Sequence, residues 1–462
     1  MAAPIRRDVP GSFRDPCGVV FERDGGLYRE VRRRYQPHYD LLMDSGLYHA
    51  LVDAGLLIPH EEVLPDPDAS PDTYRVLQPE RVLFVSYPYE WSFSQLRAAA
   101  LATLRIQRIA LQYGMSLRDA SAYNIQFRNG RPVLIDTLSF EAYKEGEPWP
   151  AYRQFCQHFL APLALMAYRD VRLVHLLRVY LDGVPLDLAA SLLPWRTRLR
   201  LSLLMHIHLH ARSQHRYAGR KDTSTLRRRP LSRNGFLGLL DSLRGGVCGL
   251  RWLPEGTEWA DYEQGDSYSA GALAHKEAIV RSFLEKVRPP SVWDLGANTG
   301  RFSRIAAELG LPTLAFDLDP AATERHWRSC IERGEHRVLP LVLDLTNPSP
   351  ALGWAHTERM SLVERGHAGM VLALAVVHHL AIGNNVPLPR VASFLASLAP
   401  WLAVEFVPPE DPKAQQLLAG REDTFSSYTQ SGFEAAFKFY YKIETMETIR
   451  DSHRALYLMR RK

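Results

Sequence analysis

The segment Ser291–Gly300, SVWDLGANTG, decides how the C-terminal part of this chain folds. A short apolar run reaches Asp294 and gives way to a turn that contains Gly296 and Gly300, and the amphipathic segment RFSRIAAELG follows. A second apolar run ends at Asp317, in TLAFDLDP. This succession of strand, glycine turn, helix and strand predicts a nucleotide-type site at the carboxyl edge of a parallel sheet.

The turn also indicates what kind of ligand it suits. Glycine permits a tight turn and lets a ligand lie against the main chain, and an acid at the end of the second strand accepts hydrogen bonds from a ribose diol. The turn reads G-x-N-x-G, with Asn298 and Arg301 where a dinucleotide fingerprint has its second and third glycines. Because a pyrophosphate needs a closer backbone approach than Asn298 permits, the turn favours a nucleoside without phosphates.

Residues 294–300, with Asp317 downstream, resemble motifs I and II of the class I S-adenosylmethionine-dependent methyltransferases. The resemblance continues in the same order through LVLDL, LALAVVHHL, WLAVEFVPPED and the closing segment HRALYLMRR. It implies an α/β fold for residues 251–462, with a Rossmann-like seven-stranded methyltransferase sheet, and S-adenosylmethionine as cofactor. The alternative is the same fold with a vestigial site. The cofactor-binding residues that the resemblance implies are Asp294, Gly296, Asn298, Gly300, Asp317 and Asp344, the last as acceptor for the adenine amino group.

Candidate catalytic residues follow the fourth and fifth predicted strands of that sheet. Methyl transfer needs an aligned nucleophile and a group that removes its proton. His378 and His379 follow the run ALAV, and an imidazole that titrates near neutrality is a suitable base for an oxygen or nitrogen acceptor. We slightly favour His378, and Glu405 is a candidate to orient a histidine or bind substrate. The alternatives are that both histidines shape the pocket or cap a helix, and that Glu405 is a buried acid paired with an arginine.

The N-terminal region carries a second pattern, LRDASAYNIQFRNGRPVLID. Asp119, then Asn124, then Asp136 at the end of an apolar run resembles the catalytic loop and metal-binding aspartate of protein-kinase-like and aminoglycoside-phosphotransferase-like folds. That resemblance implies that Asp119 orients the accepting hydroxyl and that the other two hold magnesium. However, no lysine precedes Lys144, so the strand lysine that binds the nucleotide phosphates in those folds is missing here. We therefore expect a degenerate kinase-like α+β domain over residues 1–215. An active phosphotransferase, and a turn in which Asp119 and Asn124 cap local backbone, are the alternatives.

Local patterns predict several elements of the N-terminal region. Residues 16–35 favour a β-hairpin that turns at Gly25-Gly26. Tyr39–Leu57 and Ser92–Tyr113 favour helices, and Val82–Pro88 favours a strand. His206 and His210 lie one helical turn apart, but without an evident third ligand we predict no metal site.

A basic segment separates the two halves of the chain. Arg212–Arg233 contains eight Lys or Arg residues against Asp222 and no apolar periodicity, which favours an interdomain linker over residues 216–250. Beyond it, aromatic and basic side chains precede the first strand of the C-terminal sheet and are candidates for covering the cofactor or binding substrate, or else for packing the domain edge. These candidates are Trp259, Tyr262, Tyr268 and Lys276.

Composition fits two domains with sizeable cores. The chain has 462 residues, of which 46% are hydrophobic, and a net charge of +5 that does not by itself argue for nucleic acid. Its four cysteines form no CxxC pair, and neither a signal-peptide pattern nor a membrane-length apolar run is evident, so we expect a cytoplasmic protein without a membrane span.

Sequence segments in both halves of the chain resemble bacterial two-part proteins, a group that includes host-specific nodulation proteins described as methyltransferases. Examples of these segments are YRQFCQHFLAPLALMAYRD and EFVPPEDPKAQQLL. This resemblance implies methyl transfer to a small-molecule or carbohydrate-type acceptor, at O or N, and leaves the oligomeric state open. The competing function classes are a phosphotransferase acting through Asp119, Asn124 and Asp136, and a binding protein in which neither site turns over.

Overall fold

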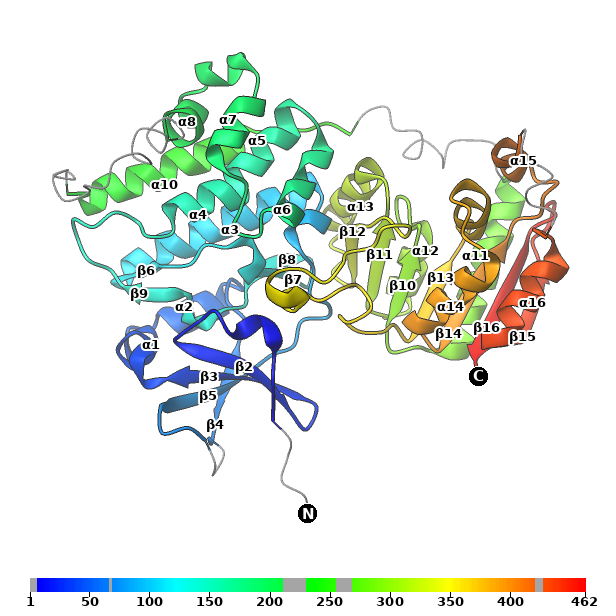
Figure 1. The fold of residues 1–462 in the computed structure, drawn as a ribbon, viewed down its shortest axis with the longest axis horizontal. Coiled ribbons are helices and arrows are strands. Elements are labelled where there is room, and N and C mark those ends of the chain that lie inside the picture. The colour runs from blue at the N-terminus through cyan, green and yellow to red at the C-terminus, as the bar shows by residue number, and fades with distance from the viewer. Residues whose placement is uncertain (1–5, 66–68, 211–229, 255–267, 420–426) are drawn as a thin grey trace. The chain divides into compact units, whose positions relative to one another are not determined.

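The computed structural model describes residues 6–65, 69–210, 230–254, 268–419 and 427–462 (Figure 1). The chain forms two compact units. Unit 1 comprises Met1–Leu253 together with Ala351–Arg359, and unit 2 comprises Pro254–Pro350 together with Met360–Lys462. In the described ranges, no helix has both the length and the apolar character that a membrane crossing requires.

Unit 2 is built on a seven-stranded sheet with the order β12-β11-β10-β13-β14-β16-β15, which confirms the sheet expected for this region. The strands are β10 (Val292–Leu295), β11 (Thr313–Asp317), β12 (Val338–Val342), β13 (Met370–Ala373), β14 (Trp401–Phe406), β15 (Tyr441–Thr448) and β16 (Ala455–Arg461). The first five in spatial order are parallel, whereas β16 runs antiparallel to β14 and to β15. The carboxyl ends of the parallel strands therefore meet at one edge.

Helices enclose this sheet, so its central strands β10 and β13 are buried along their whole length and are mostly apolar. The helices of unit 2 are α11 (Ala270–Val287), α12 (Arg301–Glu308), α13 (Pro320–Arg333), α14 (Leu388–Leu398), α15 (Pro412–Leu418) and α16 (Gln430–Tyr440). Phe283 of α11 and Ile305 of α12 belong to the same core cluster as Val292 and Leu372 of the sheet. Cys330 of α13 packs in a second cluster with Ala315 of β11.

Unit 1 begins with an antiparallel sheet of order β1-β2-β3-β5-β4. Two small hairpin-like pairs, β6 with β9 and β7 with β8, follow later in the chain. The strands are β1 (Arg7–Asp8), β2 (Gly18–Arg23), β3 (Gly26–Arg32), β4 (His60–Val63), β5 (Thr73–Pro79), β6 (Met115–Leu117), β7 (Ile125–Arg128), β8 (Arg131–Leu134) and β9 (Phe140–Ala142). The β2–β3 pair confirms the predicted hairpin.

The rest of unit 1 is mainly helical (Figure 1). Its helices are α1 (Gln36–Asp44), α2 (Leu47–Asp53), α3 (Phe93–Gln112), α4 (Tyr152–Phe155), α5 (Ala161–Tyr168), α6 (Leu176–Val179), α7 (Leu186–Leu192), α8 (Leu201–Leu203) and α10 (Arg233–Cys248). Helix α3 confirms the helix predicted over Ser92–Tyr113. The helix predicted over Tyr39–Leu57 is instead divided into α1 and α2, because Gly46 between them takes a positive φ of 82°.

Two further sequence-based expectations differ from the structure. Val82–Pro88 is not a strand, since the Gln126 side chain satisfies the backbone of Ser86: Ser86 N donates to Gln126 Oε1 (2.8 Å), and Gln126 Nε2 donates to Ser86 O (2.9 Å).

The linker expected over residues 216–250 differs from the structure in its C-terminal part, which is helical. Residues 211–229 lie outside the described ranges, but helix α10 packs against α3 within unit 1, where Arg108 pairs with Asp241.

Candidate functional site

The loops that follow β10 and β13 meet at the carboxyl edge of the sheet in unit 2. Strand β10 lies between β11 and β13, the point where the order of the parallel strands reverses direction. Gly296 follows β10 with a φ of 75°, and a Cβ atom built on it would lie only 2.5 Å from Cγ2 of Val376. Position 296 therefore requires glycine, both for its backbone conformation and for the approach of the β13 loop.

Gly300 is even more constrained. It precedes α12 with a φ of 86°, and a built Cβ would lie 1.9 Å from Nε2 of His326, a buried side chain of α13. Asn298, between the two glycines, also has a positive φ of 50°. The two glycines therefore let Val376 and His326 pack directly against the backbone of the turn.

Replacing Gly300 by alanine is expected to destabilise unit 2 by about 2–5 kcal/mol, which sums the left-handed backbone penalty and the overpacking against His326. Gly310→Ala is the matched control, because Gly310 has a φ of 81° but no atom within 4 Å of its built Cβ. The free energy of unfolding of the Gly310→Ala variant should fall only by the left-handed backbone penalty, about 1–2 kcal/mol. Denaturant unfolding measures both, and equal losses would contradict the steric argument.

Asp317 ends β11 and is fixed by backbone donors. Asn298 N donates to its Oδ2 (2.7 Å), and Asp319 N donates to its Oδ1 (2.8 Å). Each carboxylate oxygen has a further lone pair, so the group can still accept hydrogen bonds from a diol. Burial raises the pKa of Asp317 to about 6, despite the opposing effect of the two backbone bonds.

The other two acids that were predicted to bind the cofactor, Asp294 and Asp344, differ from Asp317 in their hydrogen-bond partners. Asp294 is fully buried within β10, where its Oδ2 accepts a hydrogen bond from Ser303 Oγ (2.6 Å), and burial raises its pKa to about 6. It therefore ties the strand to α12. Asp344 lies beyond β12, and its Oδ1 accepts from the backbone N (2.8 Å) and Oγ1 (2.6 Å) of Thr346, which makes a local turn.

His378 stands out among the described side chains of the edge. It is 0% exposed, and neither of its ring nitrogens has a hydrogen-bond partner. Burial, helped by the neighbouring His379 and by the positive charges of Arg454 and Lys276, holds the pKa of His378 well below its ordinary value. The ring of His379 lies 4.0 Å away, centroid to centroid, and burial lowers the pKa of that residue to about 4. The His378 imidazole is therefore neutral and can accept a hydrogen bond, but neither histidine titrates near neutrality as the sequence reasoning expected, because burial lowers both pKa values.

Glu405, on β14, lies in a buried ionic network. Its Oε2 accepts from Lys276 Nζ (2.7 Å) and its Oε1 from the Tyr268 hydroxyl, while Arg454 Nη1 lies 3.6 Å from Oε1. The arginine pairing that the sequence left open is therefore present. Since both nitrogens of His378 lack a partner, Glu405 does not bond to that ring.

The same network includes residues that the sequence reasoning passed over. Arg454 donates to both carboxylate oxygens of Asp411, at 2.7 and 3.0 Å. Asp411 and Arg454 both lie in segments that resemble the methyltransferase motifs. The sequence shows the order of these segments along the chain, but it does not show that the two side chains pair. Tyr268 and Lys276 were candidates for this region, whereas Trp259 and Tyr262 lie outside the described residues.

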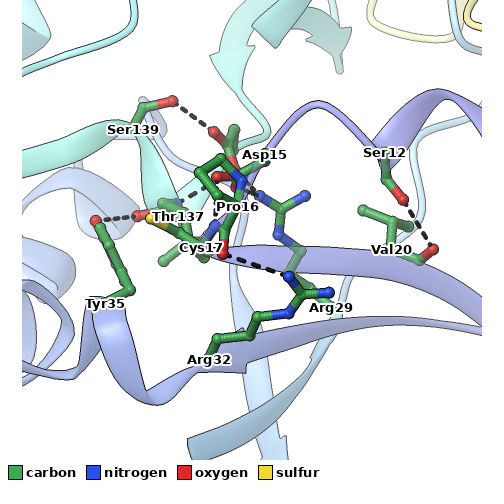
Figure 2. Close-up of polar contacts among 12 residues, drawn as sticks. Ser12, Asp15, Pro16, Cys17, Val20, Arg29, Arg32, Tyr35, Thr137 and Ser139 are labelled. Carbon is green, nitrogen blue, oxygen red and sulfur yellow. Dashed lines mark hydrogen bonds and ion pairs between the residues drawn. The ribbon is translucent and has the colours of Figure 1, made fainter. Parts of the chain in front are cut away.

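Unit 1 brings its three predicted polar residues close together. The Asp119 carboxylate interacts with Asn124 and Asp136, and burial is the largest cause of its raised pKa. However, Asp136 already accepts from Ser139 Oγ (2.7 Å) and lies 3.2 Å from Arg29 of β3. Arg29 also pairs with Asp15, from the loop before β2 (Figure 2). Arg29 of the same unit therefore already pairs with Asp136 and Asp15.

Two other features of unit 1 bear on the sequence expectations. His206 bonds through one nitrogen to the Tyr152 hydroxyl (2.8 Å) and through the other to Ser242 Oγ (2.9 Å), which is a structural role. Across the described ranges, no group of three or more His, Cys, Asp or Glu side chains is arranged to hold a metal ion.

The segment Ala351–Arg359 belongs to unit 1 although the chain on either side of it belongs to unit 2. Arg14 donates two hydrogen bonds to the Glu358 carboxylate, at 2.8 and 2.6 Å. The guanidinium carbon of Arg359 lies 4.3 Å from the ring centroid of Tyr123, which stands between Asp119 and Asn124 in the chain.

Comparison with known proteins places the whole chain in a family. No protein-family model matches it. Among solved structures, it is similar to the PH0226 protein from Pyrococcus horikoshii OT3 (15% identity, TM-score 0.31, covering 45% of this chain and 100% of the other). It is also similar to magnesium protoporphyrin IX methyltransferase (ChlM) from Synechocystis PCC 6803, crystallised with bound SAH (17% identity, TM-score 0.30, covering 41% and 84%). At these TM-scores the likeness assigns no function to this chain.

Among curated proteins, nodulation protein NoeA of Rhizobium meliloti (strain 1021) is 36% identical over 472 residues, covering 100% of this chain and 97% of that protein. The chain therefore belongs to the family of nodulation protein NoeA.

Proposed function

We propose that unit 2 is an S-adenosylmethionine-dependent methyltransferase that acts on oxygen or nitrogen of a small-molecule or carbohydrate-type acceptor. The observation that carries the proposal is the placement of Asp317 beside the Gly296–Gly300 turn at the reversal point of the sheet. Open α/β sheets bind their ligands at this point.

The residues present fit an adenosyl group. Gly296 and Gly300 permit the tight turn that brings the backbone N of Asn298 to the Asp317 carboxylate, while Val376 and His326 pack where their side chains would stand. The Asp317 carboxylate retains acceptor capacity for the two ribose hydroxyls. Nearby, Oδ2 of Asp319 is buried without a partner, which leaves one more acceptor at this edge. The cofactor supplies an electrophilic methyl group on a sulfonium.

The chain's own residues then prepare the acceptor. His378, held neutral in its buried position, accepts the hydrogen bond and later the proton of the acceptor hydroxyl or N–H. Its burial also keeps water away from the reacting atoms. Asp317 and the glycine turn hold the nucleoside, and Asp294 keeps β10 and α12 in register through Ser303.

Methyl transfer is tested with the purified full chain, methyl-labelled S-adenosylmethionine and fractionated bacterial metabolites. We expect label in at least one acceptor fraction, with S-adenosylhomocysteine as co-product. Cofactor binding by calorimetry without label in any fraction would instead indicate a binding protein that does not turn over.

Cofactor binding should depend on pH. Because the pKa of Asp317 is raised to about 6 in the free chain, the carboxyl becomes protonated as the pH falls through 6 and loses acceptor capacity for the diol. We expect the affinity for S-adenosylmethionine to be constant above pH 7 and to fall about tenfold per pH unit well below 6. Calorimetry between pH 5 and 8 measures this. An Asp317→Asn variant should bind weakly with a flatter profile, and a profile equal to that of the unmodified chain would assign the titration to another group.

A second function remains a proposal for unit 1: a kinase-like phosphotransferase site formed by Asp119, Asn124 and Asp136. The proximity of these three side chains favours it, and the occupation of Asp136 by Arg29 and Ser139 opposes it. We therefore infer a degenerate kinase-like unit. Titration with Mg-ATP is expected to show no binding, whereas tight binding that Asp136→Ala abolishes, without any response to S-adenosylmethionine, would reverse the assignment of function.

A further inference from the structure

Exposed apolar side chains gather in one short segment of unit 1. Of the 19 large hydrophobic residues that are exposed in the described part of the chain, six stand within the 18 positions from Leu192 to Leu209. Among these six, Trp195 is 72% exposed, Leu199 75% and Leu201 72%. Single exposed hydrophobic residues are ordinary on a protein surface, whereas a contiguous group of them marks an interaction site.

The second half of the segment is a helix with one apolar face in solvent. Helix α8 passes directly into a helix of wider turns that ends at Leu209. Leu201, Met205 and Leu209 recur every four residues along it and are exposed, whereas Leu203 and Ile207 are buried. The exposed side chains therefore share a face that is opposite the packed one.

The first half is tied to that helix. A short 3-10 helix, Trp195–Leu199, precedes α8, and its buried Thr197 is hydrogen-bonded through Oγ1 to Nε2 of His208 (2.9 Å). This bond holds the turn against the helix while Trp195 and Leu199, at its two ends, remain in solvent. Helices α7 and α8 lie at the end of unit 1 opposite its antiparallel sheet (Figure 1).

Three exposed arginines alternate with these apolar residues, and no Asp or Glu stands between Asp187 and Asp222 to offset their charge. Arginine can lay its methylene groups along apolar surroundings and keep its guanidinium in a polar layer. We call this set of residues the apolar–basic surface. It comprises Leu192, Trp195, Leu199, Leu201, Met205 and Leu209 together with Arg196, Arg198 and Arg200.

We propose that the apolar–basic surface binds an anionic lipid bilayer, with Trp195 and its apolar neighbours at the boundary between headgroups and acyl chains. Tryptophan suits that boundary because its ring is apolar and its N–H can keep a hydrogen bond. The arginines are complementary to the negative surface of such a bilayer. A purely apolar partner would leave the guanidinium groups without counter-charge, whereas a bilayer offers acyl chains and phosphates side by side.

Co-sedimentation of the purified full chain with lipid vesicles tests the proposal without any substitution. The vesicles are phosphatidylcholine alone, or phosphatidylcholine with about 30% phosphatidylglycerol. We expect the anionic vesicles to bind at least about tenfold more tightly, and the difference to shrink as the salt concentration rises. Binding to neither kind of vesicle, or equal binding to both, would overturn the proposal. Vesicle binding needs no cofactor, so its failure would leave the function proposed for unit 2 untouched.

The basic part of the surface is tested by the triple variant Arg196→Gln, Arg198→Gln, Arg200→Gln. Its affinity for the anionic vesicles should fall about 100-fold, since each basic residue near such a surface contributes roughly fivefold. These positions are exposed, so the fold should tolerate the change. Binding that equals that of the unmodified chain would overturn the proposal.

A second triple variant removes the same net charge from exposed positions elsewhere and is the matched control: Arg34→Gln, Arg131→Gln, Arg450→Gln. It should retain the affinity within about threefold, because charges beyond about 10 Å are largely screened at moderate salt. Equal losses in both triple variants would show that net charge, not this surface, attracts the lipid, and would overturn the proposal.

The apolar part is tested by the double variant Trp195→Gln, Leu199→Gln, which should bind anionic vesicles at least about tenfold more weakly. Its matched control is Phe439→Gln, since Phe439 of α16 is 76% exposed but lies in unit 2. Affinity that the double variant retains would overturn the proposal. So would self-association, measured by analytical ultracentrifugation without lipid, that the same two substitutions abolish in a chain that does not bind vesicles, because a second copy would then cover the surface.

Discussion

Replacing Asp317 by asparagine is expected to weaken the binding of S-adenosylmethionine by about 10- to 100-fold, because hydrogen bonds to a charged acceptor contribute about 1.5–3 kcal/mol. The amide has one acceptor oxygen instead of two, and Asn298 N and Asp319 N, which bond to different oxygens of the carboxylate, would both need it. Calorimetric titration of the purified chain at pH 7.5 measures the dissociation constant.

The control for this change is Glu332→Gln, an exposed acid-to-amide substitution on α13 of the same unit, which should leave the affinity within about twofold. Unfolding curves for both variants separate a binding defect from a folding defect. If Asp317→Asn folds and retains the affinity of the unmodified chain, the nucleoside does not lie on this carboxylate.

Replacing His378 by glutamine is expected to lower the rate of methyl transfer by about 10²- to 10⁴-fold, the usual contribution of a general base. The affinity for S-adenosylmethionine should change little, since His378 follows β13 and Asp317 ends β11. Rates are measured with labelled cofactor and the acceptor fraction that the unmodified chain methylates.

His379→Gln provides the comparison, because the two rings are neighbours with a centroid distance of 4.0 Å but only His378 has both nitrogens open. We expect the His379 variant to keep most of the rate. A large loss in His379→Gln together with an active His378→Gln would transfer the base assignment to His379. Full activity in both variants would show that neither ring accepts the proton.

Parts of unit 2 could be predicted because their signals are local. The apolar runs that end at Asp294 and Asp317, with the glycine turn between them, carry the strand–turn–helix–strand pattern within about thirty residues. Buried parallel strands are apolar along their length, so they are conspicuous in a sequence. The positive φ values of Gly296 and Gly300 follow from the same tight turn.

The remaining features depend on contacts between distant residues. Ser86 lies in a β-like run but has its backbone satisfied by Gln126, 40 residues later, and no local pattern announces that bond. The buried ionic network around Glu405 joins Tyr268 to Arg454, which are 186 residues apart. Similarly, Glu358 binds Arg14, 344 residues earlier in the chain, and its segment belongs to unit 1. Spacing identifies candidate residues, whereas their pairing is decided by tertiary packing.

A crystal structure of the full chain with S-adenosylhomocysteine tests the central claim most directly. Our account predicts density for the nucleoside against the backbone of Gly296, with both ribose hydroxyls within hydrogen-bond distance of the Asp317 carboxylate. A site there filled by the chain's own side chains, or a nucleoside bound elsewhere, would contradict it.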